Sequence, residues 1–591
     1  MSKKNMSANK LIIANCSGFY GDRLSAAKEM VMGGPIDVLT GDYLAELTMA
    51  ILQQKKKKDT ELGYVPTFLT QMEEVMGQCL KKNIRVVCNA GGLNPASMAK
   101  ALKKVADKLG LIVNIAYIDG DDLMLRLKDL QDQGEKFQHL DNGILLADSD
   151  AVPISANAYM GGWGIVKALE EGANIVVCGR VADAAVVAAP AAWHFNWSKD
   201  DWDCIAGAYA AGHIIECGIQ ATGGNYSFID EVPSYKNMGF PIAEIFEDGS
   251  FTITKHPDTG GLVSVGTVTA QLLYEINAPS YLTPDVIVRF DTLTLTQECQ
   301  DRVKASGIKG EPPTKTSKVC INTLGGHKNS MTIILTGLDI KKKADMVTEQ
   351  LFESLGGRDQ FKVTDVQLIR SDKSDPMTND EACAYLRISV IDPDAEKAGR
   401  FFSSKIIEMA LASIPGFNIT GPPSYGAPAI IHWPCLVSAK YIIQQVNMDT
   451  EIFLEDALIE FDTPVSVKVP KVSIPDPPGG KRVKAPIGRV FATRSGDKGG
   501  NANLGIWGRT PTAYAFLNKF LTVQKLTELL PDITNFEIDR YEMPNLLAIN
   551  FYIHGILGDG VAASVRSDPQ AKTLGEYLRK KIIEMPMEIM I

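Results

Sequence analysis

The chain has 591 residues, which predicts several structural units at roughly 100–200 residues per domain. Hydrophobic residues make up 45% and charged residues 22%, a composition that excludes a largely disordered chain. The formal net charge of -10 argues against attraction to nucleic acid or to an anionic membrane. We expect an anionic small-molecule substrate to be held by a local cluster of basic side chains and backbone N–H groups.

The ten cysteines are scattered, and the absence of a C-x-x-C motif argues against a zinc ribbon or a thioredoxin-type site. Cys88 and Cys178 end apolar segments, so we expect buried free thiols, as in a reducing compartment. The N-terminus lacks the apolar segment of a secretory signal. The apolar segments are shorter than the about 20 residues that span a bilayer. These features predict a cytoplasmic protein without a membrane partner.

Short apolar strands alternate with helical patterns over the first part of the chain. The predicted strands are residues 11–15, 36–40, 84–89, 111–119 and 175–178, and the predicted helices are residues 23–32, 43–53, 96–109 and 165–171. A lysine-rich segment, residues 53–59, is expected to be a solvated loop or helix end. The alternation predicts βαβ units and therefore an α/β body with a doubly wound parallel sheet.

The remainder of the body is predicted to be richer in strands. Residues 205–300 contain β-branched segments at 251–254, 262–269 and 286–291, which predict a β-rich extension. Residues 328–415 follow a β-α-β-β-α order with strands at 331–335, 363–370 and 385–390 and helices at 342–355 and 395–411. This order predicts a ferredoxin-like α+β sub-layer on a body that spans residues 10–467.

A second α+β unit is predicted at the C-terminus. Residues 468–486 are rich in proline, which fixes φ and removes a backbone donor, so we expect an extended linker. Residues 487–591 contain a hairpin-like pair, a helix at 513–530, strands at 536–541 and 547–554, and a helix at 573–584. This order predicts a C-terminal ferredoxin-like α+β domain.

Polar residues follow each predicted parallel strand. In open parallel sheets, ligands bind beyond the carboxyl ends of the strands. The residues expected to contact substrate there are Asp22, Arg23, Asn89, Asn94, Asp119 and Arg180, with Asp183 orienting a catalytic group. Arginine suits a carboxylate or phosphate, and aspartate can orient or accept a proton. The alternative is that these residues form ordinary tight turns and helix caps.

Two histidines are candidate acid/base groups. His213 and Glu216 are three residues apart and would share a helix face, either as a base with its orienting carboxylate or as two metal ligands. Alternatively, His213 is a core residue and Glu216 faces water. Lys255 and His256 precede a Gly-Gly turn, where they either serve a ligand or form a surface turn. We assign no metal ligand, and we expect Arg23, Arg180 and His256 to line one pocket.

Three glycine-rich segments complete the candidate site. Asn225 lies in a turn after Glu216, and residues 493–503 supply Arg494, Asp497, Lys498 and Asn501 for an anionic group. Residues 555–560 form a partner loop. We expect the C-terminal loops either to complete the active site or to dock a partner. Neither a complete G-x-G-x-x-G nor a P-loop occurs, and G-x-S-x-G and H-E-x-x-H are also missing.

The order of these motifs resembles that of the acyclic terpene utilisation (AtuA) family. The similarity runs through residues 18–23, 89–95, 179–183 and 255–261 (KHPDTGG), and then through 494–503 (RSGDKGGNAN) and 558–564 (GDGVAAS). It implies a large AtuA domain followed by a ferredoxin-like one. It also implies catabolism of citronellol- or geraniol-like branched acids as coenzyme A thioesters, but it supplies no residue roles.

Three functional hypotheses follow. The first is an enzyme, a hydratase, lyase or thioester-acting enzyme, that acts on a branched acyl-CoA or related carboxylate, with coenzyme A as part of the substrate and with a homo-oligomeric assembly. The second is a non-catalytic scaffold or ligand-binding subunit of an acyl-CoA-processing complex. The third is a metal-dependent lyase that uses His213 and Glu216.

Overall fold

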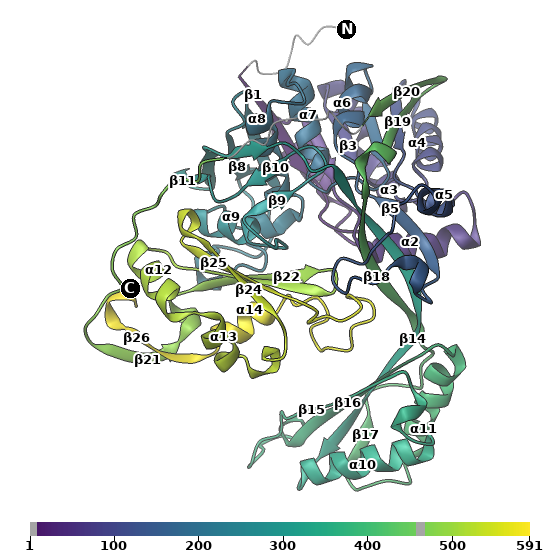
Figure 1. Ribbon diagram of the computed structural model, residues 1–591, viewed down its shortest axis with the longest axis vertical. Coiled ribbons are helices and arrows are strands. Elements are labelled where there is room, and N and C mark those ends of the chain that lie inside the picture. The colour runs from purple at the N-terminus through teal and green to yellow at the C-terminus, as the bar shows by residue number, and fades with distance from the viewer. Residues whose placement is uncertain (1–8, 457–466, 591) are drawn as a thin grey trace.

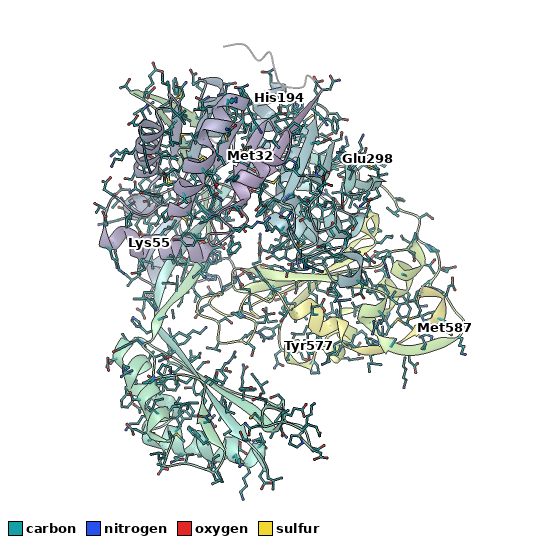
Figure 2. All side chains as sticks on the ribbon, turned by 180° about the vertical axis from the view of Figure 1, so that it is seen from behind. Met32, Lys55, His194, Glu298, Tyr577 and Met587 are labelled. Atoms are coloured by element: carbon teal, nitrogen blue, oxygen red, sulfur yellow. The ribbon has the colours of Figure 1, made fainter. Side chains whose placement is uncertain are left out.

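The computed structural model describes residues 9–456 and 467–590, which form three parts (Figure 1). We call residues 10–326 and 427–456 the body, residues 327–420 the lobe, and residues 482–590 the C-terminal domain. The lobe projects from the body at the far end of the long strand β14 (Figure 1). Seen from behind, the C-terminal domain, marked by Tyr577 and Met587, lies on the opposite side of the molecule from Lys55 (Figure 2).

In the described part of the chain, the body is built on one eleven-stranded sheet of order β11-β12-β8-β7-β1-β2-β3-β6-β4-β19-β20. Its central strands are parallel, and antiparallel strands extend both edges. The parallel strands are β1 (Lys10–Asn15), β2 (Val38–Gly41), β3 (Arg85–Cys88), β6 (Ile175–Cys178) and β4 (Ile115–Asp119). The antiparallel strands are β7 (Pro241–Phe246), β8 (Phe251–Lys255), β12 (Arg302–Ser306), β11 (Thr294–Cys299), β19 (Ile443–Met448) and β20 (Glu451–Asp456).

Helices cover both faces of the parallel strands, which explains why these strands are apolar throughout. Ile13 of β1 joins the core on one face and Ala14 the core on the other. The first face carries α6 (Trp163–Glu170), α7 (Ala185–Phe195) and α8 (Trp202–Ile215), and the second carries α1 (Ala26–Gly33), α2 (Glu46–Lys58), α3 (Pro66–Lys82) and α4 (Pro95–Leu109). Because β3 leads into α4 and the adjacent β6 leads into α7, the chain leaves these two strands toward opposite faces of the sheet. Ligands of open α/β sheets commonly bind beyond the carboxyl ends of strands at such a switch point.

The lobe has the ferredoxin-like strand arrangement. Its strands lie in the order β15-β16-β14-β17, and every neighbouring pair is antiparallel. The elements are β14 (Thr316–Thr336), α10 (Ile340–Ser354), β15 (Val363–Ile369), β16 (Cys383–Asp392), α11 (Phe402–Glu408) and β17 (Phe417–Ile419). The first half of β14 belongs to the body, where it pairs with β5 (Pro153–Ala158) and β18 (Ala427–Ser438). One strand therefore connects the two parts.

The C-terminal domain has its own core and a sheet of order β22-β23-β25-β24. Its elements are β21 (Arg482–Pro486), β22 (Ala492–Lys498), β23 (Asn501–Trp507), α12 (Pro511–Phe520), α13 (Val523–Leu529), β24 (Ile538–Met543), β25 (Ala548–Ile553), α14 (Leu574–Arg579) and β26 (Ile582–Pro586). If β23 is taken as the first strand of a ferredoxin-like unit, then β22 occupies the edge that the fourth strand normally fills. The edge strand thus carries the 494–503 motif into the domain interface.

The α/β character of the chain is confirmed, but the large sheet is mixed rather than purely parallel. Residues 262–269, expected to be strand-like, belong largely to α9 (Val265–Leu272), because Ser264 and Thr267 form a reciprocal capping box. The expected helix at 513–530 is broken between α12 and α13, where Thr522 caps the second helix. The last residues of the expected linker form β21, which pairs with β26.

The remaining segments of the body form a small antiparallel sheet of β9 (Ser280–Leu282), β10 (Ile287–Arg289) and β13 (Lys309–Glu311) beside α8. All ten cysteines are free, and Cys88 and Cys178 are buried as expected. No helix within residues 9–456 and 467–590 has the length and apolar character needed to span a bilayer.

Candidate functional site

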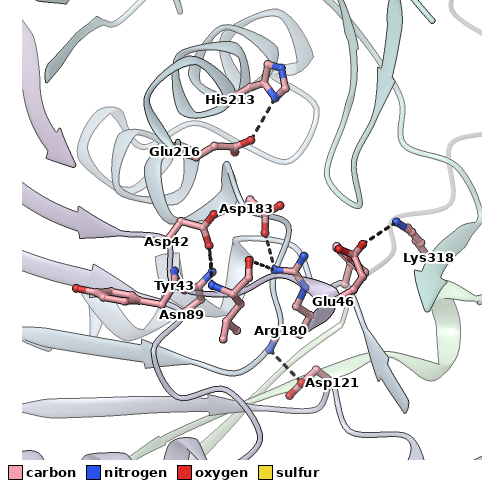
Figure 3. A network of polar contacts seen from close by, with 12 residues as sticks. Asp42, Tyr43, Glu46, Asn89, Asp121, Arg180, Asp183, His213, Glu216 and Lys318 are labelled. Carbon is pink, nitrogen blue, oxygen red and sulfur yellow. Dashed lines mark hydrogen bonds and ion pairs between the residues drawn. The ribbon is translucent and has the colours of Figure 1, made fainter. Parts of the chain in front are cut away.

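The carboxyl ends of β2, β3 and β6 bring three polar side chains together (Figure 3). The Asn89 amide donates to Asp42 Oδ1 at 2.5 Å and accepts from the backbone N–H of Tyr43 at 2.8 Å. Arg180 Nη1 donates to the carbonyl of Leu44 in the same turn at 3.4 Å. These three strands are consecutive in the sheet, in the order β2-β3-β6, so the sheet topology explains why these residues meet.

Arg180 is the central cation of this network, with only 2% of its surface exposed. Its Nη1 lies 2.5 Å from Asp183 Oδ1, and its guanidinium stacks 4.2 Å from the centre of the Tyr159 ring. Its backbone N–H donates to Asp121 Oδ2 at 3.0 Å. Burial alone would lower the pKa of Arg180, but Asp183, Tyr159 and nearby carboxylates outweigh burial and raise it. Arg180 is therefore a permanent positive charge inside the protein.

Glu46, the first residue of α2, is held in its ionised form. Tyr159 donates to Glu46 Oε1 at 2.9 Å, and Lys318 Nζ lies 3.5 Å from the same oxygen (Figure 3). Burial would raise the pKa of Glu46, but the charges of Lys318, His432 and Arg180 hold it well below its usual value. A partly buried carboxylate of this kind can accept a proton or a hydrogen bond from a ligand.

His213 and Glu216 lie at the buried end of α8. Their Nδ1 and Oε1 atoms are 3.3 Å apart, and neither ring nitrogen has a hydrogen-bond partner among the described residues. Burial and then the charge of Lys498 lower the pKa of His213 to about 4. Burial and then Asp183 raise the pKa of Glu216. His213 is therefore neutral at pH 7, and both ring nitrogens and Glu216 Oε2 have unused hydrogen-bonding capacity among the described residues.

The C-terminal domain contributes the end of β22 to this region. Lys498 Nζ lies 5.7 Å from the ring centre of Tyr281, the residue that also packs against His213. Burial, followed by the charges of Glu275 and Glu46, raises the pKa of Asp497 to about 8. Asp497 is therefore a carboxylic acid that stays protonated near neutral pH.

A small cavity of about 60 Å³ lies between the body and the C-terminal domain. Glu46 and His432 line it from the body and Asp497 from the C-terminal domain. Cys320 Sγ lies 3.1 Å from His432 Nδ1, whereas His432 Nε2 has no hydrogen-bond partner within the described ranges. Burial lowers the pKa of His432 to about 4. An ionised carboxylate, a protonated carboxyl group and a neutral imidazole thus border one space.

The model of the acyclic terpene utilisation family protein AtuA matches residues 11–448, and the model of the AtuA ferredoxin-like domain matches residues 485–584. The chain belongs to the AtuA family. Membership implies involvement in acyclic terpene utilisation. Searches among curated proteins and among solved structures returned no match.

The motifs of the AtuA ferredoxin-like domain contribute to both the site and the interface. Asp497, Gly499 and the segment 561–562 line the small cavity. Asn501 instead ties the domain to the body, because its amide donates to Asp141 Oδ1 at 2.7 Å. Arg494 and Asn225 line a second, larger cavity.

Several residues expected in the AtuA site lie elsewhere. Arg23 pairs with Glu29 at 2.6 Å and packs over Phe240, and Asp22 accepts the backbone N–H groups of Gly18 and Arg23 within their turn. Asn94 caps α4 by accepting from the backbone N–H of Ser97 at 3.2 Å. These contacts support the turn-and-cap alternative for these positions.

Lys255 and His256 are also separated from Arg180. Lys255 Nζ lies 3.2 Å from Asp301, and His256 Nε2 donates to the carbonyl of Met30 at 3.0 Å. Their strand β8 is separated from β6 by four strands, roughly 24 Å at about 4.8 Å per step. The structure therefore does not bring Arg23, Arg180 and His256 into the single pocket that the sequence predicted.

Asp119 ends β4 beside the site, and burial raises its pKa. Sequence reasoning missed four site residues, namely Glu46, Tyr159, Lys318 and His432. Of these, only Glu46 carried a signal, as an acidic residue in the first turn of a predicted helix. Across the described residues, no group of three His, Cys, Asp or Glu side chains is arranged to hold a metal ion.

Proposed function

We propose that the chain is a catabolic enzyme that acts by acid/base chemistry on a branched, acyclic terpenoid-like acyl-CoA or related carboxylate. Glu46 is the general base and Asp497 the general acid. Proton removal from water or from the carbon beside the carbonyl, combined with proton donation to the neighbouring atom, is the core of a hydratase or lyase reaction. The same pair suits carbon–carbon cleavage or thioester hydrolysis, in which the acid protonates the leaving group.

The observation that carries the proposal is the opposite displacement of two carboxyl pKa values around one cavity. The pKa of Glu46 is lowered and that of Asp497 is raised to about 8, so that near neutral pH one is a base and the other an acid. Pairs of carboxyl groups with diverging pKa values identify acid/base roles in well-characterised enzymes. His432, neutral and with Nε2 unpaired among the described atoms, would hydrogen-bond the substrate carbonyl.

The buried cluster beneath the cavity would act through electrostatics. Arg180 and Lys318 keep Glu46 ionised, and Asp183 orients Arg180 through their 2.5 Å ion pair. A cavity of about 60 Å³ admits the reacting atoms but not an acyl chain, since ligand sites usually measure about 300–1,000 Å³. The proposal therefore requires the C-terminal segment at residues 561–570 to move when substrate enters.

The test is turnover of branched acids and their coenzyme A thioesters, followed by mass spectrometry. We expect Asp497→Asn and Glu46→Gln each to lower kcat by about 10²-fold or more, because each removes one proton-transfer group. Asp539→Asn, in β24 of the same domain, is the matched control and should retain full activity. Activity should also fall as pH rises through about 8, where Asp497 loses its proton, and Asp497→Asn should abolish that pH dependence. Wild-type rates in both variants would exclude the assignment.

A non-catalytic scaffold is the second candidate, and the projecting lobe is the feature that favours it (Figure 1). A scaffold would turn over none of the thioesters alone and would co-purify with an acyl-CoA-processing enzyme. Substitution of exposed lobe residues would then abolish co-purification without affecting any reaction of the chain itself.

A further inference from the structure

A cavity of about 720 Å³ lies between residues 225–231 of the body and the C-terminal domain. Its volume is within the range of small-molecule sites. Its lining contains five basic side chains, Arg489, Arg494, Arg509, Lys572 and Arg579, and three acidic ones, Asp230, Glu231 and Glu576. We call this space the arginine cleft. In a chain of net charge -10, five cations against three anions make this cleft locally positive, which favours an anionic ligand.

Two of the five cations are already neutralised. Arg509 Nη1 lies 2.6 Å from Glu231, and Arg579 Nη1 lies 2.7 Å from Glu576. Lys572 and Arg489 have no ion pair within residues 9–456 and 467–590. The only bond of the Arg494 side chain there is to the neutral amide oxygen of Gln220. Three positive charges therefore line the cleft without a carboxylate partner.

The arginines are held rigidly by aromatic rings. Arg494 is only 4% exposed and stacks 3.9 Å from the ring centre of Tyr274, and its Nε has no hydrogen-bond partner among the described residues. The guanidinium groups of Arg509 and Arg579 lie 4.3 and 5.4 Å from the Phe228 ring. Arg579 Nε is likewise unpaired in the described part. Stacking fixes the guanidinium planes and leaves N–H edges for a ligand.

We propose that the arginine cleft binds a ligand with a pyrophosphate group. Guanidinium groups bind phosphate oxygens through paired N–H donors, and the two phosphates of a pyrophosphate supply enough charge for Arg494, Lys572 and Arg489 together. A monocarboxylate would neutralise one of these cations and leave two unpaired. The assignment goes beyond the proposed function, because the cleft can bind a pyrophosphate whether or not Glu46 and Asp497 catalyse a reaction.

Isothermal titration calorimetry of the full chain tests this assignment with inorganic pyrophosphate, ADP, coenzyme A, inorganic phosphate and acetate. We expect the three pyrophosphate-containing ligands to bind and acetate to bind at least about 100-fold more weakly, since two or more charge-assisted contacts distinguish them. Coenzyme A binding more tightly than ADP would identify a thioester carrier as the source of the group. Equal affinities would identify a simple nucleotide.

The variant Lys572→Gln combined with Arg489→Gln should weaken pyrophosphate binding by about tenfold or more, because both cations face the cleft and have no other ion pair there. Lys519→Gln combined with Lys580→Gln removes the same charge from exposed positions outside the cleft and should change affinity less than about twofold. Equal losses in both double variants, or no binding of any pyrophosphate ligand by the wild type, would overturn the proposal. Turnover of free acids by a chain that binds none of the three pyrophosphate ligands would overturn it while leaving the proposed function intact.

Discussion

The lobe and the C-terminal domain have the same predicted order of elements, yet they contact the rest of the molecule in different ways. The C-terminal domain docks on the body through buried amides: Asn503 donates to the carbonyl of Leu273 at 2.5 Å, and Asn550 donates to that of Asn277 at 3.1 Å. Both side chains have 0% exposure. The lobe projects from the body, and its contacts with the C-terminal domain include the 2.6 Å bond from Arg387 to the carbonyl of Val565 (Figure 1).

This difference teaches that topology alone does not locate the site in this molecule. The lobe has the usual ferredoxin-like strand order, but the proposed acid comes from the C-terminal domain, whose edge strand β22 is rearranged. The charge of Lys498 lowers the pKa of His213 in the body, and the charge of Glu46 raises the pKa of Asp497. Charged groups therefore couple the C-terminal domain to the body electrostatically. Substitutions of charged residues in the lobe provide the comparison that tests this coupling.

The largest expected effect is on the buried cation. Arg180→Met should lower the free energy of unfolding by about 3–5 kcal/mol, because the buried Asp42 and the partly buried Asp183 would lose the positive charge beside them. Arg387→Met in the lobe is the matched control and should cost about 1–2 kcal/mol, because it removes two hydrogen bonds and a 3.7 Å ion pair with Asp365 at partly exposed side chains. Urea denaturation measures both values. Equal losses would mean that the Arg180 network is no more important to stability than a lobe contact.

A smaller effect is expected in the pH dependence of stability. The pKa of His213 is lowered from 6.5 to about 4 in the folded state, so the unfolded chain binds a proton first as pH falls. Stability should therefore be lost between about pH 6.5 and 4, by on the order of 2–3 kcal/mol for this residue. His213→Phe should remove this loss, since its ring can pack against Tyr281 and Phe290 without a titratable nitrogen.

The acid-induced loss of stability should depend on a charge in the C-terminal domain and not on one in the lobe. Lys498→Met should reduce the acid-induced loss, because the charge of Lys498 contributes to the lowered pKa of His213. Lys397→Met in the lobe, which removes a pair with Asp392 at 3.1 Å, should leave the His213-dependent part unchanged. Denaturation curves at several pH values provide the measurement. If Lys397→Met altered that part as much as Lys498→Met, the electrostatic coupling would not be specific to the C-terminal domain.

Much of the parallel sheet could be predicted because its strands are short apolar segments between amphipathic helices. The five expected parallel strands overlap β1, β2, β3, β4 and β6, and residues 175–178 match β6 at both ends. The prediction of a strand at residues 262–269 was wrong. The β-branched residues there favour a strand locally, whereas the Ser264 capping box and burial of the helix favour α9.

The site could be predicted only where a motif followed one of the adjacent strands β3 and β6. Asn89, Arg180 and Asp183 meet because β6 is inserted between β3 and β4, which places the turns after β3 and β6 side by side. His256 followed a strand as well, but lateral strand order is a tertiary property, and β8 lies far from β6. His432 and Lys318 reach the site from long strands without any distinctive local pattern, so no sequence signal indicated them.

The smallest expected effect concerns one serine hydroxyl at the interface between the body and the C-terminal domain, compared with one in the lobe. Ser227 Oγ donates to the carbonyl of Thr493 at 2.8 Å and accepts from its backbone N–H at 3.0 Å, and Ser227 is only 6% exposed. Ser227→Ala should cost about 1–2 kcal/mol, because a buried N–H and a buried carbonyl both lose their partner. Ser330→Ala in the lobe removes a 2.7 Å bond between the exposed Ser330 and the buried Ser389, and it should cost about 0.5–1 kcal/mol, since only one buried hydroxyl loses its partner. Thermal unfolding of the two variants compares the losses of stability directly. A larger loss from Ser330→Ala would contradict the view that burial at the interface distinguishes the docked domain from the projecting lobe.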